Sequence, residues 1–500
     1  QILYLLLGCL IPFQFLTAKV YSSPERTPVD YVNPYIGNIS HLLVPTYPTV
    51  HLPNSMLRIY PERENFTGNT INGLPLIVTS HRGSSAFNLS PYQGELQKAG
   101  SIIQYGYDNE VIKPYYYSVD LDDDGIYVQY APSHQSGIYQ IDFSQTDKPA
   151  YLIFNTRDGE LKTDGKSISG YQKLGNHTQV YIYLETDQQP LKIGTHQGAV
   201  IRTTDKSTQG HNAYYILEYP KGTASVLLRY GVSFISSEQA KQNLRREIKN
   251  YNLQAVADKG RSVWNETLGK IFVKGGTENE KTVFYTSLYR TYERMICISE
   301  DGRYFSAYDG QVHDDEGIPF YVDDWIWDTY RATHPLRLII ETEMESNMVN
   351  SLIRMAYQMQ PNWMPTFPEI NGDSRRMNCN HGVATVLDAY NKGMRSFDLA
   401  KAYQVCKAAI TEKTLAPWSS KPAGVLDQFY KDHGYFPALA VGEQETVPEV
   451  HSWERRQPAA VTLGTVYDEW CLGNIAQALG DKKEADYFLK RSLNYHKIFN

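Results

Sequence analysis

The pattern of hydrophobic and polar residues changes character near residue 236. Before this point, short segments alternate between apolar and polar side chains and end at turn residues, which is typical of β-strands. The stretch YYYSVDLDDDGIYVQY at 115–130 predicts two strands joined by a hairpin at Asp124-Gly125. Residues 27–235 therefore predict an antiparallel β-sandwich domain. Further strands of this domain are predicted at 139–145, 151–162, 179–186 and 224–234.

After this point, apolar residues recur at steps of three and four positions, as they do in amphipathic helices. Ser236 with Gln239, and later Thr277 with Glu280, have the spacing of capping boxes, and both pairs predict helix starts. The first helix begins a linker over 236–276, in which the apolar stretch LGKIFVKGG predicts one strand after the helix.

Residues 277–500 predict a series of helices with no strands between them. Serial helices joined by short loops pack as antiparallel hairpins, and repeated hairpins can close into a toroid with a pocket at one end. The predicted hairpins are fewer than a closed (α/α)6 toroid contains, so we expect the barrel to be incomplete in this chain. The fold class is therefore multidomain β + α. After the helix that starts near Thr277, further helices are predicted at 324–333, 344–359, 381–393, 398–411, 458–480 and 483–498.

The first 22 residues predict an export signal. They contain the apolar run ILYLLLGCLIPFQFL, which is too short and wrongly flanked for a membrane span, and cleavage is expected near Ala18. The LLGC sequence ending at Cys9 resembles a lipoprotein box, but the apolar stretch beyond it favours ordinary cleavage. We expect an exported protein, periplasmic, secreted or at the cell surface, with lipidation as the alternative and no integral membrane span in the mature protein.

Composition narrows the class of protein. With 42% hydrophobic and 21% charged residues, the chain is typical of globular proteins. The formal net charge of -7 argues against a nucleic-acid partner, because nucleic-acid binders usually present a basic face. The 39 tyrosines suit sugar or peptide surfaces, although a β-rich domain also favours tyrosine. There is no zinc-type cysteine spacing, no nucleotide-binding glycine motif, no HExxH and no GxSxG.

Candidate chemistry concentrates in DDWIWDTYRATHP, residues 323–335. A helix over this stretch would place Asp324, Asp328 and Arg331 on one face. Trp327 stands beside Asp328, and such a pair can hold a sugar, because the carboxylate accepts paired hydroxyls while the ring covers the apolar C–H face. The alternative is a capped helix with an Asp328–Arg331 ion pair and tryptophans in the core.

Other titratable residues lie just before and within the helix predicted at 381–393. Glu369 and Asp373 lie on a loop before it, where functional carboxylates often occur, although caps and solvated groups are the alternative. His381 and Asp388 are seven positions apart on the helix itself, and a histidine that is satisfied at the helix start is the alternative to a functional role.

Many separate blocks of the chain resemble glycoside hydrolase family 92, from about residue 28 to residue 500. The blocks include YVNPYIG, VSFISSEQAKQNL, FYTSLYRTYERM, DGRYFSAYDGQVH, WDTYRATHPL, HGVATVLDAYNKGMRSFD, LDQFYKDHGYFP and VYDEWCLGNIAQALG. The resemblance implies an N-terminal β-sandwich joined to an (α/α)6 barrel. It also implies an exo-acting, calcium-dependent α-mannosidase that acts on mannose-containing glycans and inverts the anomeric carbon.

The resemblance also implies site residues. The family's Trp-Asp-Thr-Phe-Arg segment matches 327–331, so Trp327, Asp328 and Arg331 are expected to bind the terminal mannose. The histidine that follows this segment matches His334, and His381 matches a Gly-x-His segment; both are expected at the same site. The family's acid lies in a Glu-Gly-Asn type motif and its base in a Gly-Asn-Asp-Asp type motif. Neither motif occurs here, so both are expected beyond residue 500, and this chain is expected to be inactive alone.

Two N-terminal segments depart from the family pattern. Residues 38–60 replace the usual Gly/His-rich turn with its FPGA and PFGM sequences, and residues 76–91 replace a His-Thr-His-rich segment. Such loops reach the pocket rim. The second hypothesis is therefore a carbohydrate-binding protein of the same fold that has lost catalysis, and a third is a related glycoside phosphorylase.

Overall fold

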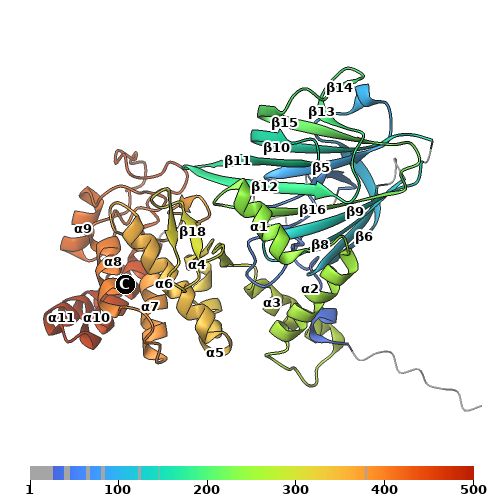
Figure 1. The fold of residues 1–500 in the computed structure, drawn as a ribbon. Coiled ribbons are helices and arrows are strands. Elements are labelled where there is room, and N and C mark those ends of the chain that lie inside the picture. The colour runs from blue at the N-terminus through green and yellow to red at the C-terminus, as the bar shows by residue number, and fades with distance from the viewer. Residues whose placement is uncertain are drawn as a thin grey trace, which may run out of the picture.

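A computed structural model describes most of the chain. The predicted export signal at 1–22 and Asp124 of the predicted hairpin turn lie outside the described residues. The described residues are 26–38, 46–63, 68–79, 85–121, 125–145, 147–377 and 380–499. A β domain and a helical domain lie side by side (Figure 1).

Within its described residues, the β domain contains sixteen strands and two short 3-10 helices. The strands are β1 Val50–His51, β2 Arg58–Ile59, β3 Thr70–Asn72, β4 Leu74–Pro75, β5 Phe87–Tyr92, β6 Gln104–Lys113, β7 Tyr116–Leu121, β8 Ile126–Pro132, β9 Ser136–Phe143, β10 Ala150–Thr163, β11 Ser167–Gly175, β12 Thr178–Thr186, β13 Lys192–Gln197, β14 Val200–Arg202, β15 Ser207–Tyr219 and β16 Ser225–Ser233. The 3-10 helices are Pro28–Tyr31 and Leu96–Lys98.

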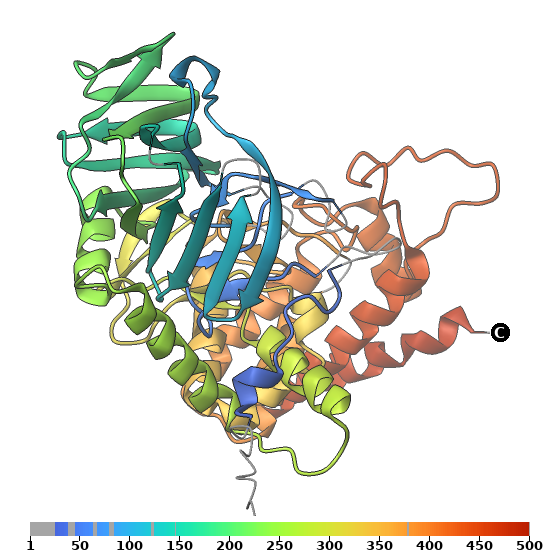
Figure 2. The same ribbon diagram turned by 90° about the vertical axis from the view of Figure 1, so that its right-hand side faces the viewer.

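These strands pair in the antiparallel sense, as predicted. Fourteen of them form one sheet with the main order β14-β13-β15-β10-β11-β12-β16-β9-β8-β7-β6-β3. The sheet twists strongly, so that β6–β9 turn away from β10–β12 and β15, while β16 joins the two layers (Figures 1 and 2). The predicted hairpin forms between β7 and β8, with Leu121 opposite Ile126. Both layers contribute side chains to one hydrophobic core, which explains their packing.

Alternation along the strands fixes which face is buried. In β12, Val180, Ile182 and Leu184 are almost fully buried, whereas the tyrosines between them, Tyr181 and Tyr183, are only partly covered. Because successive side chains point to opposite faces of a strand, this pattern holds the register against the neighbouring strands.

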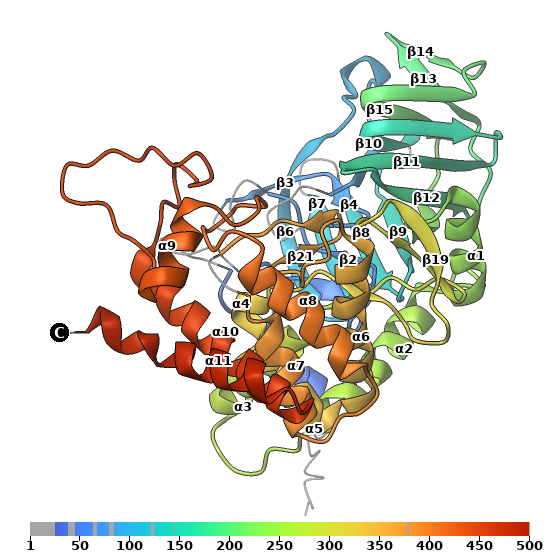
Figure 3. The same ribbon diagram turned by 90° about the vertical axis from the view of Figure 1, so that its left-hand side faces the viewer.

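The second half of the chain is mainly helical. Its helices are α1 Ser237–Glu247, α2 Leu253–Leu268, α3 Glu278–Thr291, α4 Ile326–Thr329, α5 Thr333–Ile340, α6 Thr342–Gln358, α7 Gly382–Asn391, α8 Leu399–Thr411, α9 Val425–His433, α10 Pro458–Ala478 and α11 Lys482–Ser492, which a 3-10 turn extends at Leu493–Ile498. Consecutive helices such as α7 and α8, and α10 and α11, pack against each other (Figure 3). A β domain followed by a helical domain confirms the predicted fold class.

Two predicted features of this half are wrong. The strand predicted within 268–276 does not form, and α2 occupies part of the linker instead. The backbone after α2 satisfies its polar groups with a side chain, because Tyr285 donates to the carbonyl of Ile271 and accepts from the amide of Val273. Short strands also intervene between the helices: β17 Ile296–Cys297, β18 Arg303–Ser306, β19 Gln311–Asp314, β20 Tyr321–Val322, β21 Pro368–Glu369 and β22 Gly372–Asp373.

Polar contacts join the two domains. Trp264 of α2 donates its indole N–H to the carbonyl of His51 at 2.7 Å. The tip of the β11–β12 hairpin reaches the turn between β21 and β22, where Asn176 donates to the carbonyl of Asn371 at 2.9 Å (Figure 1). Asn371 in turn donates to the carbonyl of Leu174 at 3.2 Å. These contacts fix the β21–β22 turn against the β domain.

Candidate active site at the domain junction

The tryptophan-rich segment 323–335 forms two helices rather than one. The prediction of a single helix at 324–333 is wrong, because α4 covers only four residues and α5 starts anew at Thr333. Ala332 breaks the helical run with φ -136° and ψ -46°. Asp323 takes a left-handed backbone, φ 67°, immediately before the segment.

Asp323 is the anchor of this segment to the β domain. Its carboxylate accepts from Arg58 Nη2 at 2.5 Å and from Arg294 Nη1 at 3.1 Å. The side chains of Arg58 and Asp323 are each only 4% exposed, so the pair is desolvated. Arg294 also lies 3.9 Å from the centroid of the Trp325 ring, which stacks on Phe367 at 5.5 Å. One guanidinium thus holds both a carboxylate and an indole in place.

Asp324 belongs to a buried network behind the segment. His334 Nε2 lies 2.8 Å from Asp324 Oδ2, and His334 Nδ1 lies 2.7 Å from Glu345 Oε1. Burial lowers the pKa of His334, but the two carboxylates outweigh it and raise this pKa to about 10. Thr329 donates to Asp324 Oδ1 at 2.8 Å, so the network ties α4 to α5 and α6. His334, predicted to bind substrate, therefore lies buried with both ring nitrogens engaged.

Trp327, Asp328 and Arg331 lie on the solvent side of the same segment. Asp328 is exposed, and its carboxylate forms no ion pair or side-chain hydrogen bond with any residue that the structure describes. Partial burial and the neighbouring Asp324 raise the pKa of Asp328. The guanidinium of Arg331 lies 5.9 Å from the Trp327 ring centroid instead of pairing with Asp328. The segment thus presents a carboxylate, an indole and a guanidinium together.

His381 lies at the start of α7, close to this group. Its Nδ1 is 2.6 Å from Asp468 Oδ1 on α10, and its ring centroid is 4.2 Å from that of Tyr330. His381 is buried, so its described contacts are those of a helix-start residue that links two helices. Asp388 is turned outward and pairs with Lys392 at 2.5 Å.

A cavity of about 190 Å³ opens between the two domains next to Asp323. Glu369 and Arg376 form an ion pair of 3.3 Å in its wall. Burial raises the pKa of Glu369, against the influence of Arg376. Asp373, the other loop carboxylate, instead organises its turn by accepting from the amide of Phe367 at 2.9 Å. The full lining is Thr79, Leu174, Asp323, Glu369, Ile370, Asn371 and Arg376.

Some residues at this cavity have a left-handed backbone. Asp323 lines the cavity with φ 67°, and Arg375 and Met377, on either side of Arg376, have φ angles of 49° and 67°. Left-handed conformations of residues other than glycine cost free energy, which the surrounding contacts must offset.

Sequence reasoning missed Arg58, Arg294 and Arg376. Each of these arginines forms an ion pair only because the fold brings its partner close, and the local sequence does not indicate that contact. Glu369 had a signal, since it stands on a loop before a helix.

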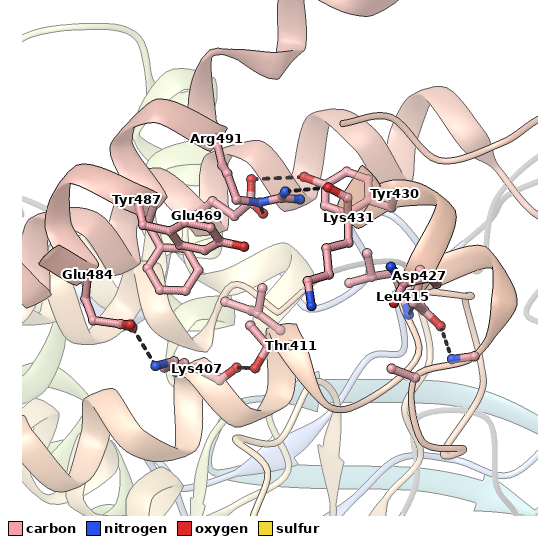
Figure 4. Close-up of a pocket in the computed structure, with 15 residues that line it drawn as sticks. Lys407, Thr411, Leu415, Asp427, Tyr430, Lys431, Glu469, Glu484, Tyr487 and Arg491 are labelled. Carbon is pink, nitrogen blue, oxygen red and sulfur yellow. Dashed lines mark hydrogen bonds and ion pairs between the residues drawn. The ribbon is translucent and has the colours of Figure 1, made fainter. Parts of the chain in front are cut away.

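A second cavity of about 340 Å³ lies between α8, α9, α10 and α11 (Figure 4). Its charged side chains largely satisfy one another. Arg491 pairs with Glu469 at 2.6 Å and Lys407 pairs with Glu484 at 2.5 Å. This cavity shares no lining residue with the domain junction, and we do not assign a sugar to it.

The described residues contain no group of three or more His, Cys, Asp or Glu side chains arranged to hold a metal ion. Asp323, Asp324 and Glu369 are already paired with arginine or histidine, which leaves Asp328 as a single unpaired carboxylate beside them among the described residues. The side chains described here therefore do not fit the calcium that the family resemblance implies. None of the described helices combines the length and hydrophobicity needed to span a membrane.

The twisted β domain followed by paired helices has the two-domain organisation of a known glycosyl hydrolase family. The chain belongs to glycosyl hydrolase family 92, because residues 31–233 match its N-terminal domain and residues 239–500 match its catalytic domain.

Solved structures share this fold. The family 92 inverting mannosidase of Bacteroides thetaiotaomicron has a TM-score of 0.83 and 25% identity, over 96% of this chain and 66% of that chain. A family 92 α-mannosidase of the same organism, solved with mannoimidazole, has a TM-score of 0.82 and 22% identity, over 95% and 64%. A protein of Arthroderma benhamiae described as an uncharacterized secreted glycosidase is 22% identical, over 98% of this chain and 64% of its own length. The chain thus spans about two thirds of the length of these relatives.

Proposed function

We propose that this protein is an exo-acting, inverting α-mannosidase that hydrolyses terminal α-linked mannose from glycans. The observation that carries the proposal is the exposed carboxylate of Asp328, which has no partner among the described residues and follows Trp327 directly in the sequence, in a chain of this family. The mannosidase structures that share the fold support the choice of sugar.

The site residues have separate roles in this proposal. Asp328 accepts hydrogen bonds from two adjacent hydroxyls of the terminal mannose, and Trp327 covers its apolar C–H face. Arg331 donates to a further hydroxyl at the rim. His334 does not touch the sugar. It holds Asp324, whose bond to Thr329 fixes the direction in which α4 presents Asp328.

Inversion requires an acid and a base about 6.5–9.5 Å apart with a water between them. We assign neither role to a residue of this chain, since each described carboxylate near the site other than Asp328 is paired. Calcium dependence belongs to the proposal as a family property, and no step is derived through the ion. Export of the protein is supported by the relative that is described as secreted.

Two measurements test this function. Calorimetric titration of the chain with methyl α-mannoside should give binding, with glucose and galactose derivatives as matched controls. Incubation of a full-length form of the protein with α-linked mannosides and calcium should release β-mannose first, as seen by proton NMR, and chelation should slow the release. This chain alone should release no mannose. Release of α-mannose first would rule out inversion.

The alternative is a carbohydrate-binding protein without catalysis, which the unusual segments 38–60 and 76–91 motivate. It predicts that mannose binds while no mannoside is hydrolysed at any calcium concentration. Absence of both binding and hydrolysis would exclude the two functions together.

A further inference from the structure

Beside the Glu369–Arg376 cavity lies a group of aromatic side chains that the proposed mannose contacts do not use. The Arg376 guanidinium lies 5.9 Å from the Phe367 ring centroid and 5.8 Å from the Trp418 ring centroid. The Trp418 ring centroid lies 6.0 Å from that of Trp453, at an angle of 59°. The rings therefore continue outward from the wall of the cavity.

Two loops present these indoles in fixed positions. Trp418 lies in the α8–α9 connection. The two ends of this connection are joined by a β-bridge between Lys413 and Pro422 and by a hydrogen bond from the Thr414 amide to the carbonyl of Lys421.

Trp453 lies in the long α9–α10 connection, which projects from the helical domain (Figures 2 and 3). His451 Nδ1 accepts from the Trp453 amide at 3.3 Å, and its ring packs 5.2 Å from Trp418. Within the same connection, Arg456 donates two hydrogen bonds to the Glu445 carboxylate, of 2.6 and 2.9 Å.

The two indoles differ in exposure. Trp453 is 75% exposed, whereas Trp418 is partly buried, so the Trp453 ring is the free apolar face that a ligand could cover. A flat indole beside a guanidinium complements a pyranose ring, because the ring covers the C–H face while the guanidinium donates to hydroxyls. A folded apolar peptide would gain nothing from the charged neighbour Arg376.

We propose that Trp418, Trp453 and Arg376 form a subsite for a second sugar residue of the glycan, beyond the terminal mannose. The inference rests on the proposed function, because it assumes that Asp328 and Trp327 hold the terminal sugar. Asp323 relates the two places, since it begins the segment that carries Asp328 and lines the same cavity as Arg376.

Calorimetric titration of the full chain with methyl α-mannoside and with α-linked mannose di- and trisaccharides tests this subsite. The best oligosaccharide should bind about tenfold more tightly than the monosaccharide. Trp453→Ala should abolish most of that advantage, so that the ratio of the two affinities approaches one. Phe272→Ala removes another ring, 80% exposed and outside the site, and should keep the ratio of the wild-type chain.

An unchanged ratio in Trp453→Ala, or equal affinities in the wild-type chain, would overturn the subsite while mannose binding still supports the proposed function. If the wild-type chain binds neither the monosaccharide nor any oligosaccharide, the proposed function and the subsite fall together.

Discussion

Asp328 differs from the neighbouring carboxylates in that no described cationic side chain pairs with it. Asp323 and Asp324 are neutralised by arginine and histidine, whereas Asp328 has no such partner among the described residues. A free carboxylate accepts charge-assisted hydrogen bonds, worth about 1.5–3 kcal/mol each. Asp328→Asn should therefore weaken binding of methyl α-mannoside by about 10- to 100-fold in a calorimetric titration.

Glu218→Gln provides the control for this change, because Glu218 lies in β15 of the β domain and pairs with Lys192 at 2.8 Å. Its affinity should equal that of the wild-type chain. Equal losses in the two variants would argue that charge in general, and not the position of Asp328, governs binding.

His334 makes a prediction about stability. Replacing it with glutamine leaves at least one of the buried carboxylates of Asp324 and Glu345 without a cation, and breaking a buried pair costs about 3–5 kcal/mol. The pKa of His334 is raised to about 10, above the ordinary value near 6.5, so the folded state keeps a proton that the unfolded state loses. The contribution is therefore complete below about pH 6.5 and is lost as the pH rises to about 10.

Urea denaturation between pH 7 and pH 9.5 measures this effect. The stability gap between the wild-type chain and His334→Gln should shrink by about 1.4 kcal/mol per pH unit. His313→Gln is the matched control, since His313 pairs with Asp309 at 2.8 Å but is 33% exposed. A gap that stays constant with pH would mean that His334 is not protonated in the folded state.

At this scale, adjacency in the sequence places Trp327 next to Asp328, and their joint binding of a sugar stays a prediction. The buried contacts of His334 could not be predicted from the sequence. Its position after the tryptophans resembles that of a ligand residue, but Glu345, which accepts from its second nitrogen, lies on a different helix. The ion pairs of Asp323 with Arg58 and Arg294 join residues far apart in the chain, so no local sequence pattern predicts them.

Among the elements, long periodic segments are the predictable ones. The helix predicted at 458–480 corresponds to α10, and the strand predicted at 179–186 lies within β12. The short elements at the junction were missed, since β21 and β22 have two residues each and depend on a turn that Asp373 organises. Local propensity carries little information over such lengths, and tertiary contacts decide the conformation.

The packing of α1 on the sheet depends on a glycine. A Cβ atom at Gly231 of β16 would lie 2.1 Å from the carbonyl oxygen of Ala240 and 2.9 Å from the amide of Leu244, both in α1. Gly231→Ala should therefore push α1 away from the sheet and cost about 1–3 kcal/mol or more in urea denaturation. Ser207→Ala, at an exposed strand position, should leave stability within about 0.5 kcal/mol. Unchanged stability in Gly231→Ala would show that α1 does not pack as closely as described.

For the molecule as a whole, the cavity beside Asp323 forms where the two domains meet. The β domain supplies Thr79 and Leu174 to its wall, and the helical domain supplies Asp323, Glu369, Ile370, Asn371 and Arg376. Neither set forms the cavity alone, so the geometry of the site depends on how firmly the domains are joined. The buried Arg58–Asp323 pair is the charged contact that spans this boundary at the cavity wall.

Arg58→Ala should therefore uncouple the two domains. It leaves Asp323 with Arg294 alone in a buried place, at a cost of about 3–5 kcal/mol at the junction. All seven tryptophans lie at or after residue 264, so their fluorescence reports the helical domain and its junction, while circular dichroism also reports the sheet. The two urea midpoints should coincide in the wild-type chain and separate in Arg58→Ala. Arg26→Ala, which breaks an exposed pair with Glu278, should keep them together. Coincident midpoints in Arg58→Ala would mean that other contacts suffice to join the domains.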